Sequence, residues 1–183
     1  QYIARRDEFS SKKEKKLIRM KKKLNLTSSK RERLSLYNQI YREYYTYRYD
    51  SAMVYANRGL QLAEQLHDDY FINLNKINRA AVLSTGGFYS QAADMLLSLK
   101  PEDISPKLMQ YYYYTLTWVY NYWEAFCERS EFKEEMQDKK RLYLAKTLEY
   151  VGNKHSALYY YLSGELEYLL HRTDKKVLGW YQK

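Results

Sequence analysis

The sequence predicts an all-α fold built from antiparallel helix pairs. Apolar residues recur at helical spacing on both sides of a Gly86-Gly87 break, where two glycines let the chain reverse at low steric cost. Glycine and proline are scarce, with 6 and 2 among 183 residues, which disfavours a β-sandwich with its many tight turns. Because one helical hairpin cannot cover its own apolar faces, the sequence also predicts similar hairpins stacked beside it.

The expected helices follow one another with short breaks. A basic N-terminal helix and its linker take up residues 1–30, with Leu17, Met20 and Leu24 as a short apolar stripe. Residues 31–183 are expected to form the repeat array. Its hairpins are predicted at about 31–66, 69–99, 106–151 and 153–183, with the last one truncated. Ser29 and its neighbouring hydroxyls suit the start of one helix, and Asp50 or Ser51 is expected to cap another.

Short matches recur at offsets of 36–40 residues, which is typical of a helical-repeat array. Each match is weak alone, but all three fall at corresponding positions of the predicted hairpins. The matched segments are 37–42 with 74–79, 49–52 with 89–92, and 138–140 with 174–176.

These repeats resemble the tetratricopeptide (TPR) family, whose helix pairs carry a turn glycine, an aromatic residue and a small residue in order. Gly87, Tyr89 and Ala92 stand in those places in the second repeat, and Tyr49 and Ala52 in the first. The resemblance implies a TPR-like right-handed superhelix of antiparallel helix pairs, an α-α superhelix.

A narrower resemblance rests on the basic N-terminal helix, with Tyr2 and Arg5-Arg6, and on the segment 49–52. Together they resemble the TPR-type sensor regions of uncharacterised bacterial membrane-bound transcriptional regulators. This implies a periplasmic domain of an inner-membrane protein, with a cytoplasmic location as the alternative and a membrane helix further along the full-length chain. The start at Gln1 fits a piece of a longer protein. The longest uncharged run, 108–123, has only 16 residues, fewer than a membrane-spanning helix needs.

The net charge of +9 belongs to one end of the chain. Residues 1–33 hold 13 Lys and Arg against four acids, while the other 150 residues hold 18 of each sign. This balance disfavours nucleic-acid binding by the body of the chain. Contact of the N-terminal helix with nucleic acid or a membrane surface remains an alternative.

No catalytic constellation, cofactor motif or metal site is recognisable, so the sequence predicts a protein that is not an enzyme. His67, His155 and His171 have no His, Cys or carboxylate at metal-ligand spacing. Gly86-Gly87 lacks the lysine and serine of a phosphate-binding loop. Cys127, the single cysteine, is interpreted as a buried small apolar residue.

A first candidate binding surface lies on the first helices of the first two hairpins. Asn38 and Arg42 are four residues apart, and Asn75 and Arg79 repeat them on a flank away from the packed apolar face. Stacked repeats would align them as a ladder suited to an extended peptide or an acidic terminus. The alternative is that they are solvated or bridge helices.

A second candidate surface lies on the helix at 106–126. Two apolar stripes there, one of them containing Trp118, predict packing on two sides. Tyr113, Thr117 and Tyr120 are left on the third face, where tyrosines suit contact with a peptide or a sugar ring. Core packing is the alternative explanation for these aromatic residues.

The function predicted is a non-catalytic module that binds a protein, a peptide or a small ligand and serves as the sensor part of a regulator. The alternative is a glycan- or peptide-binding scaffold of a nutrient-uptake complex.

Overall fold

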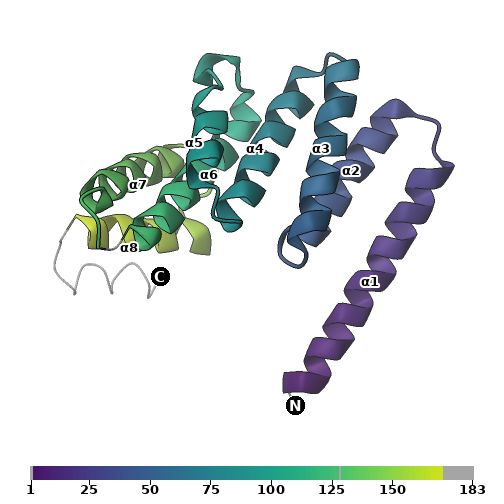
Figure 1. Ribbon diagram of the computed structural model, residues 1–183, viewed down its shortest axis with the longest axis horizontal. Helices are drawn as coiled ribbons and strands as arrows, with labels where there is room; N and C mark the ends of the chain where they lie inside the picture. Colours follow the sequence, from purple (N-terminus) through teal and green to yellow (C-terminus); the bar gives the residue numbers. More distant parts are fainter. Residues whose placement is uncertain (1, 128, 171–183) are drawn as a thin grey trace. The chain divides into compact units, whose positions relative to one another are not determined.

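The computed structural model describes residues 2–127 and 129–170, with side chains in the first helix described from Ser10 onward. This part of the chain is all-α, with antiparallel TPR-like helix pairs, which confirms the predicted fold class (Figure 1). The last part of the predicted hairpin at 153–183, from residue 171 onward, lies outside the described residues. The α-helices are α1 (Tyr2–Leu26), α2 (Lys30–Tyr45), α3 (Tyr49–Gln65), α4 (Asp69–Thr85), α5 (Tyr89–Leu97), α6 (Pro106–Phe126), α7 (Lys133–Glu149) and α8 (Ala157–Leu169), with a 3₁₀ turn η1 (Pro101–Asp103).

The chain divides into two compact units. Unit 1 covers residues 1–82 and contains α1, α2, α3 and most of α4. Unit 2 covers residues 83–183 and contains α5, α6, α7 and α8. Each unit has its own apolar cluster.

Local signals explain most of the helix starts. Ser29 is the N-cap of α2, as predicted, and its hydroxyl accepts a hydrogen bond from the Glu32 N–H at 3.3 Å. The cap expected at Asp50 or Ser51 was wrong. Arg48 is the N-cap of α3, with extended backbone and no side-chain capping bond, and Asp50 lies in the first turn, where its charge favours the helix dipole. Gly87 has a φ of 87°, which favours glycine in the turn before α5.

The core of unit 1 forms where α1 packs against α2. Leu17 and Leu24 of α1 are buried against a cluster that includes Leu36, Ile40 and Tyr44 of α2. Because the helices run antiparallel, one face of α1 follows α2 for several turns (Figure 1). The N-terminal helix therefore covers the first hairpin as an additional layer.

Helices α3 and α4 approach closely within unit 1. A Cβ atom at Gly59 would lie 2.3 Å from Oδ1 of Asn75, closer than two non-bonded heavy atoms can come. Glycine at this position lets the fully buried Asn75 side chain lie against the α3 backbone. A second small cluster of Leu34, Leu62 and Ala63 completes this side of the core.

The core of unit 2 is built around α6. Its buried face is covered by α7, and a further cluster of Leu144, Val151, Leu162 and Leu169 joins α7 to α8. Five ring pairs link six aromatic side chains into one column. The column runs through Tyr89, Trp123, Tyr120, Tyr143, Tyr113 and Tyr150.

None of the helices within residues 2–127 and 129–170 combines enough length with enough apolar character to cross a membrane.

Candidate functional site

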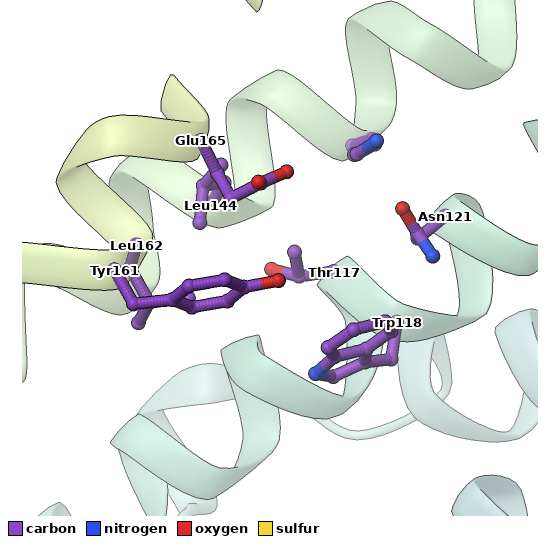
Figure 2. Close-up of a pocket in the computed structure, with 8 residues that line it drawn as sticks. Thr117, Trp118, Asn121, Leu144, Tyr161, Leu162 and Glu165 are labelled. Atoms are coloured by element: carbon purple, nitrogen blue, oxygen red, sulfur yellow. The ribbon is translucent and has the colours of Figure 1, made fainter. Parts of the chain in front are cut away.

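A cavity in unit 2 lies where α6, α7 and α8 meet, and we name it the α6–α8 pocket. Its volume is about 150 Å³. Each of the three helices contributes two or three of the side chains that line it (Figure 2). They are Thr117, Trp118 and Asn121 from α6, Lys140 and Leu144 from α7, and Tyr161, Leu162 and Glu165 from α8.

The polar groups of the pocket face one another across a small space. In Figure 2 the hydroxyl end of Tyr161 points toward Thr117, and the Glu165 carboxylate extends into the same space from α8. Trp118 and Asn121 lie on the opposite side, on α6. Hydroxyl, amide, indole and carboxylate groups therefore converge there, and together they offer both donors and acceptors.

Contacts within unit 2 hold the walls of the pocket in place. The Lys140 ammonium pairs with the Glu124 carboxylate at 3.1 Å, and both side chains are largely buried. The Trp118 indole packs edge-on to Tyr114 and lies 5.6 Å from the Tyr122 ring, measured between centroids. Because Lys140 is already paired with Glu124, its charge does not offset that of Glu165, the other charged residue of the lining.

The Tyr161 hydroxyl is protonated at neutral pH. Burial raises the pKa of this phenol, and the nearby Glu165 carboxylate raises it further. Tyr161 can therefore donate a hydrogen bond to a ligand while Glu165 accepts one. A ligand bound through these two hydrogen bonds does not need to carry a charge.

The sequence contains a signal for the pocket in the spacing of its lining residues. Each of the three helices contributes two lining residues four positions apart, which places both on one helical face. The pairs are Thr117 with Asn121, Lys140 with Leu144, and Tyr161 with Glu165. Of the seven residues predicted as a site, only Thr117 lines this pocket. The other lining residues were missed because their helices had not been placed side by side.

The expected ladder of exposed Asn and Arg side chains does not form. Asn38 is buried, donates from Nδ2 to the Leu34 carbonyl at 3.0 Å, and accepts from Nδ2 of Asn78 at 3.1 Å. Asn75 is fully buried and donates to the Phe71 carbonyl at 2.8 Å. These amides satisfy helix carbonyls and join α2 to α4, so neither faces a groove in this structure.

The two arginines of the ladder are placed differently from the asparagines. Arg42 is exposed on α2, whereas Arg79 is half-buried on α4. The Nε of Arg79 is buried with no hydrogen-bond partner among the described residues. The structure therefore does not bring the four predicted side chains together on one accessible surface.

The predicted third face of α6 is buried as well. Tyr113, Thr117 and Tyr120 are buried under α7, where Tyr143 stacks on both tyrosine rings and Thr147 lies 3.3 Å from the Thr117 hydroxyl. The prediction that this face is open to a partner was wrong. The stripe that contains Trp118 is packed in part: Tyr114 lies against the apolar cluster of α7 and α8, Trp118 is half-buried, and Tyr122 is exposed.

Two buried tyrosines give unit 2 a pH-dependent stability. Burial raises the pKa of Tyr112 and of Tyr120 to about 12, from an ordinary value near 10. The Tyr112 hydroxyl donates to the Leu96 carbonyl at 3.3 Å. Since folding favours the neutral phenols, their contribution is complete below pH 10 and is lost as the pH rises from about 10 to 12.

We therefore expect unit 2 to lose about 2–3 kcal/mol of stability for each of these tyrosines across that window. Urea unfolding followed by far-UV ellipticity at a series of alkaline pH values measures this loss. Tyr120→Phe should reduce the loss, because it removes one titrating hydroxyl and keeps the ring. An unfolding midpoint that does not change between pH 9 and pH 12 would contradict the burial of these phenols.

The basic residues of α1 contact the first hairpin in part. The Lys16 ammonium pairs with Glu43 at 2.6 Å, and Lys23 pairs with Glu32 at 2.9 Å. Lys21 lies over the Tyr44 ring, and hydrogen bonding to that tyrosine raises the pKa of Lys21. Three basic residues of α1 therefore contact the first hairpin, whereas Lys15, Arg19 and Lys22 are exposed.

No group of three or more His, Cys, Asp or Glu side chains that could hold a metal ion occurs in the part of the chain that the structure describes. Cys127 is half-buried at the end of α6, and His171 lies outside the described residues.

Comparison with known proteins gives one family match. The family model described as "SusR N-terminal TPR domain" matches residues 3–183. No match was found among curated proteins or among solved structures.

Proposed function

The chain belongs to the SusR N-terminal TPR domain family, and from that premise we propose that it is the non-catalytic, ligand-binding module of a regulator. TPR-type helical repeats are generally binding modules. This proposal rests on the α6–α8 pocket, in which three consecutive helices direct polar and aromatic side chains toward one small space (Figure 2). Binding pockets in proteins typically combine an apolar wall with a few convergent polar groups.

The pocket favours a small, uncharged, hydrogen-bonding ligand such as a sugar or another polyol. A volume of about 150 Å³ is too small for a folded partner or a long peptide segment. Because Lys140 is paired with Glu124, the Glu165 carboxylate disfavours an anionic ligand. Trp118 and Tyr161 provide aromatic surface, while Thr117 and Asn121 can bond hydroxyl groups.

The proposed signal is mechanical. A ligand that contacts α6, α7 and α8 together would favour one arrangement of α8 against the other two helices. Residues that follow α8 in the sequence would then be affected by the ligand's presence. We propose that this is the sensor step of a membrane-bound bacterial transcriptional regulator with its repeat domain in the periplasm, and a reporter fusion to the full-length protein would test that location.

Calorimetric titration of the whole chain tests the proposed function. The probes are neutral mono- and disaccharides, polyols, free amino acids and dipeptides. At least one neutral hydroxylated probe should bind. Glu165→Gln and Asn121→Ala should each weaken that binding by about tenfold, since each removes a hydrogen bond made in the pocket.

Glu149→Gln is the matched control, because Glu149 is exposed at the end of α7 and lies outside the pocket. It should leave binding unchanged. Equal losses in Glu149→Gln and Glu165→Gln, or binding of dipeptides alone with no effect of either pocket variant, would contradict the proposal.

A further inference from the structure

A second cavity lies in unit 1, on the side of α2 and α3 near the start of α2 and the end of α3. Its volume is about 350 Å³, within the range of small-molecule sites. Its polar lining consists of Ser28, Lys30, Arg33, Arg58, Gln61 and Gln65. We name it the α2–α3 cavity. It is formed by different residues from the α6–α8 pocket and is independent of the function proposed there.

The charge of this cavity is unbalanced. Lys30, Arg33 and Arg58 line it, and no carboxylate is among the lining residues. Lys30 and Arg58 form no ion pair within the described part of the chain, and Arg33 donates to the Thr27 carbonyl at 3.1 Å. Lys30 and Arg58 are exposed, and the Arg58 guanidinium lies over the Tyr55 ring at 5.4 Å, so solvent screens much of their repulsion, but no acid of the lining offsets the three cations.

The acid closest in sequence does not supply that anion. Glu32 is the neighbour of Arg33, but its carboxylate pairs with Lys23 and accepts from the Thr27 hydroxyl. Lys30 is also the first residue of the 16-residue helix α2, whose N-terminus adds a partial positive charge on the same side. The positive field of the cavity is therefore left for a ligand.

The rest of the lining indicates which chemical group of a ligand would carry the negative charge. Arginine forks match the oxygens of a phosphate or a carboxylate, and three cations suit the two charges of a phosphate monoester better than the single charge of a carboxylate. Gln61, Gln65 and Ser28 can bond hydroxyl groups of the same molecule. The buried Leu62 and the partly buried Tyr37 supply the apolar part of the lining.

We propose that the α2–α3 cavity binds a small phosphorylated metabolite through its phosphate group. The two guanidinium groups, of Arg33 on α2 and of Arg58 on α3, bind the phosphate from two helices, with Lys30 beside them. The module then has two separate binding sites, a neutral one in unit 2 and an anionic one in unit 1.

Titration calorimetry of the whole chain tests this proposal with glycerol 3-phosphate, inorganic phosphate and succinate as probes. Glycerol 3-phosphate should bind most tightly, because its hydroxyls reach the glutamine side chains, and succinate should bind at least about tenfold more weakly. Arg58→Gln should weaken the binding of glycerol 3-phosphate by about tenfold or more.

Arg19→Gln is the matched control, because Arg19 is an exposed arginine on α1 in the same unit and lies outside the cavity. It should change binding by less than about twofold. Far-UV ellipticity confirms that both variants are folded. Equal losses in the two variants would show binding to diffuse charge, and succinate binding as tightly as glycerol 3-phosphate would show a carboxylate site. Either result, or the absence of binding to the unmodified chain, overturns the proposal.

Discussion

Replacing Tyr120 with alanine is expected to lower the free energy of unfolding by about 3–5 kcal/mol, as for other large aromatic residues removed from a core. Its side chain is 1% exposed. Its ring stacks between Trp123, at 6.0 Å, and Tyr143, at 5.5 Å, and Lys139 lies over it. Removing this ring leaves a cavity in the middle of the aromatic column. Urea unfolding followed by far-UV ellipticity measures the loss.

Tyr168→Ala is the control for this experiment, because Tyr168 is 67% exposed and its truncation should change stability by less than about 0.5 kcal/mol. The comparison also separates two roles for Tyr120. If Tyr120→Ala kept full stability and lost ligand binding, the residue would contact the ligand directly, and its placement in the core would be wrong.

Replacing Leu17 with alanine is expected to destabilise unit 1 by about 2–5 kcal/mol, the range measured for buried leucines. Leu17 is 0% exposed and is the deepest contact of α1 with the first hairpin. The ion pairs along the same helix contribute less, since the Lys16–Glu43 pair lies at the surface and such pairs are worth about 0–1 kcal/mol. Urea unfolding and limited proteolysis of α1 measure the effect.

Ile18 provides a matched control one residue away. It is 63% exposed, so Ile18→Ala removes a similar aliphatic side chain without opening the core. It should leave the unfolding midpoint nearly unchanged. If Lys16→Ala destabilised unit 1 more than Leu17→Ala, or if high salt alone released α1 to proteases, electrostatic attraction rather than apolar packing would hold the helix.

The sequence predicted the helices well because their signals are local. The spacing of apolar residues, the Ser29 cap and the φ of Gly87 each depend on a few neighbouring residues. The stacking of Leu17 and Leu24 against a neighbour also follows from the pattern of one helix. These features need no knowledge of which helix lies next to which.

The exposure of polar and aromatic faces could not be predicted in the same way. Asn38 belongs to the core because its amide bonds a carbonyl of its own helix and meets Asn78 from α4, and Asn75 because Gly59 leaves room for it. On α6, the tyrosine face is buried only because α7 brings Tyr143 onto it. An amphipathic pattern shows that a helix has faces, but the neighbouring helix decides which face is covered.

The α6–α8 pocket shows the same limit for the site. Its i, i+4 pairs were visible in the sequence, yet such pairs occur on most helices and mark a site only when three of them converge. That convergence depends on how α8 lies across α6 and α7. Trp118 belongs to a partly packed stripe, and its position in the lining of the pocket does not follow from its residue type alone.

The pairing of helices that are consecutive in sequence has a consequence for how the chain reaches its fold. In unit 1, α1 packs on α2 and α2 on α3, and in unit 2 the pairs are α5 with α6, α6 with α7 and α7 with α8. Contacts between sequence neighbours close short loops, for which the entropic cost is low, and chains rich in such contacts cross their folding barrier quickly. Each unit is therefore suited to fold during synthesis, with α1 docking on the first hairpin soon after that hairpin leaves the ribosome.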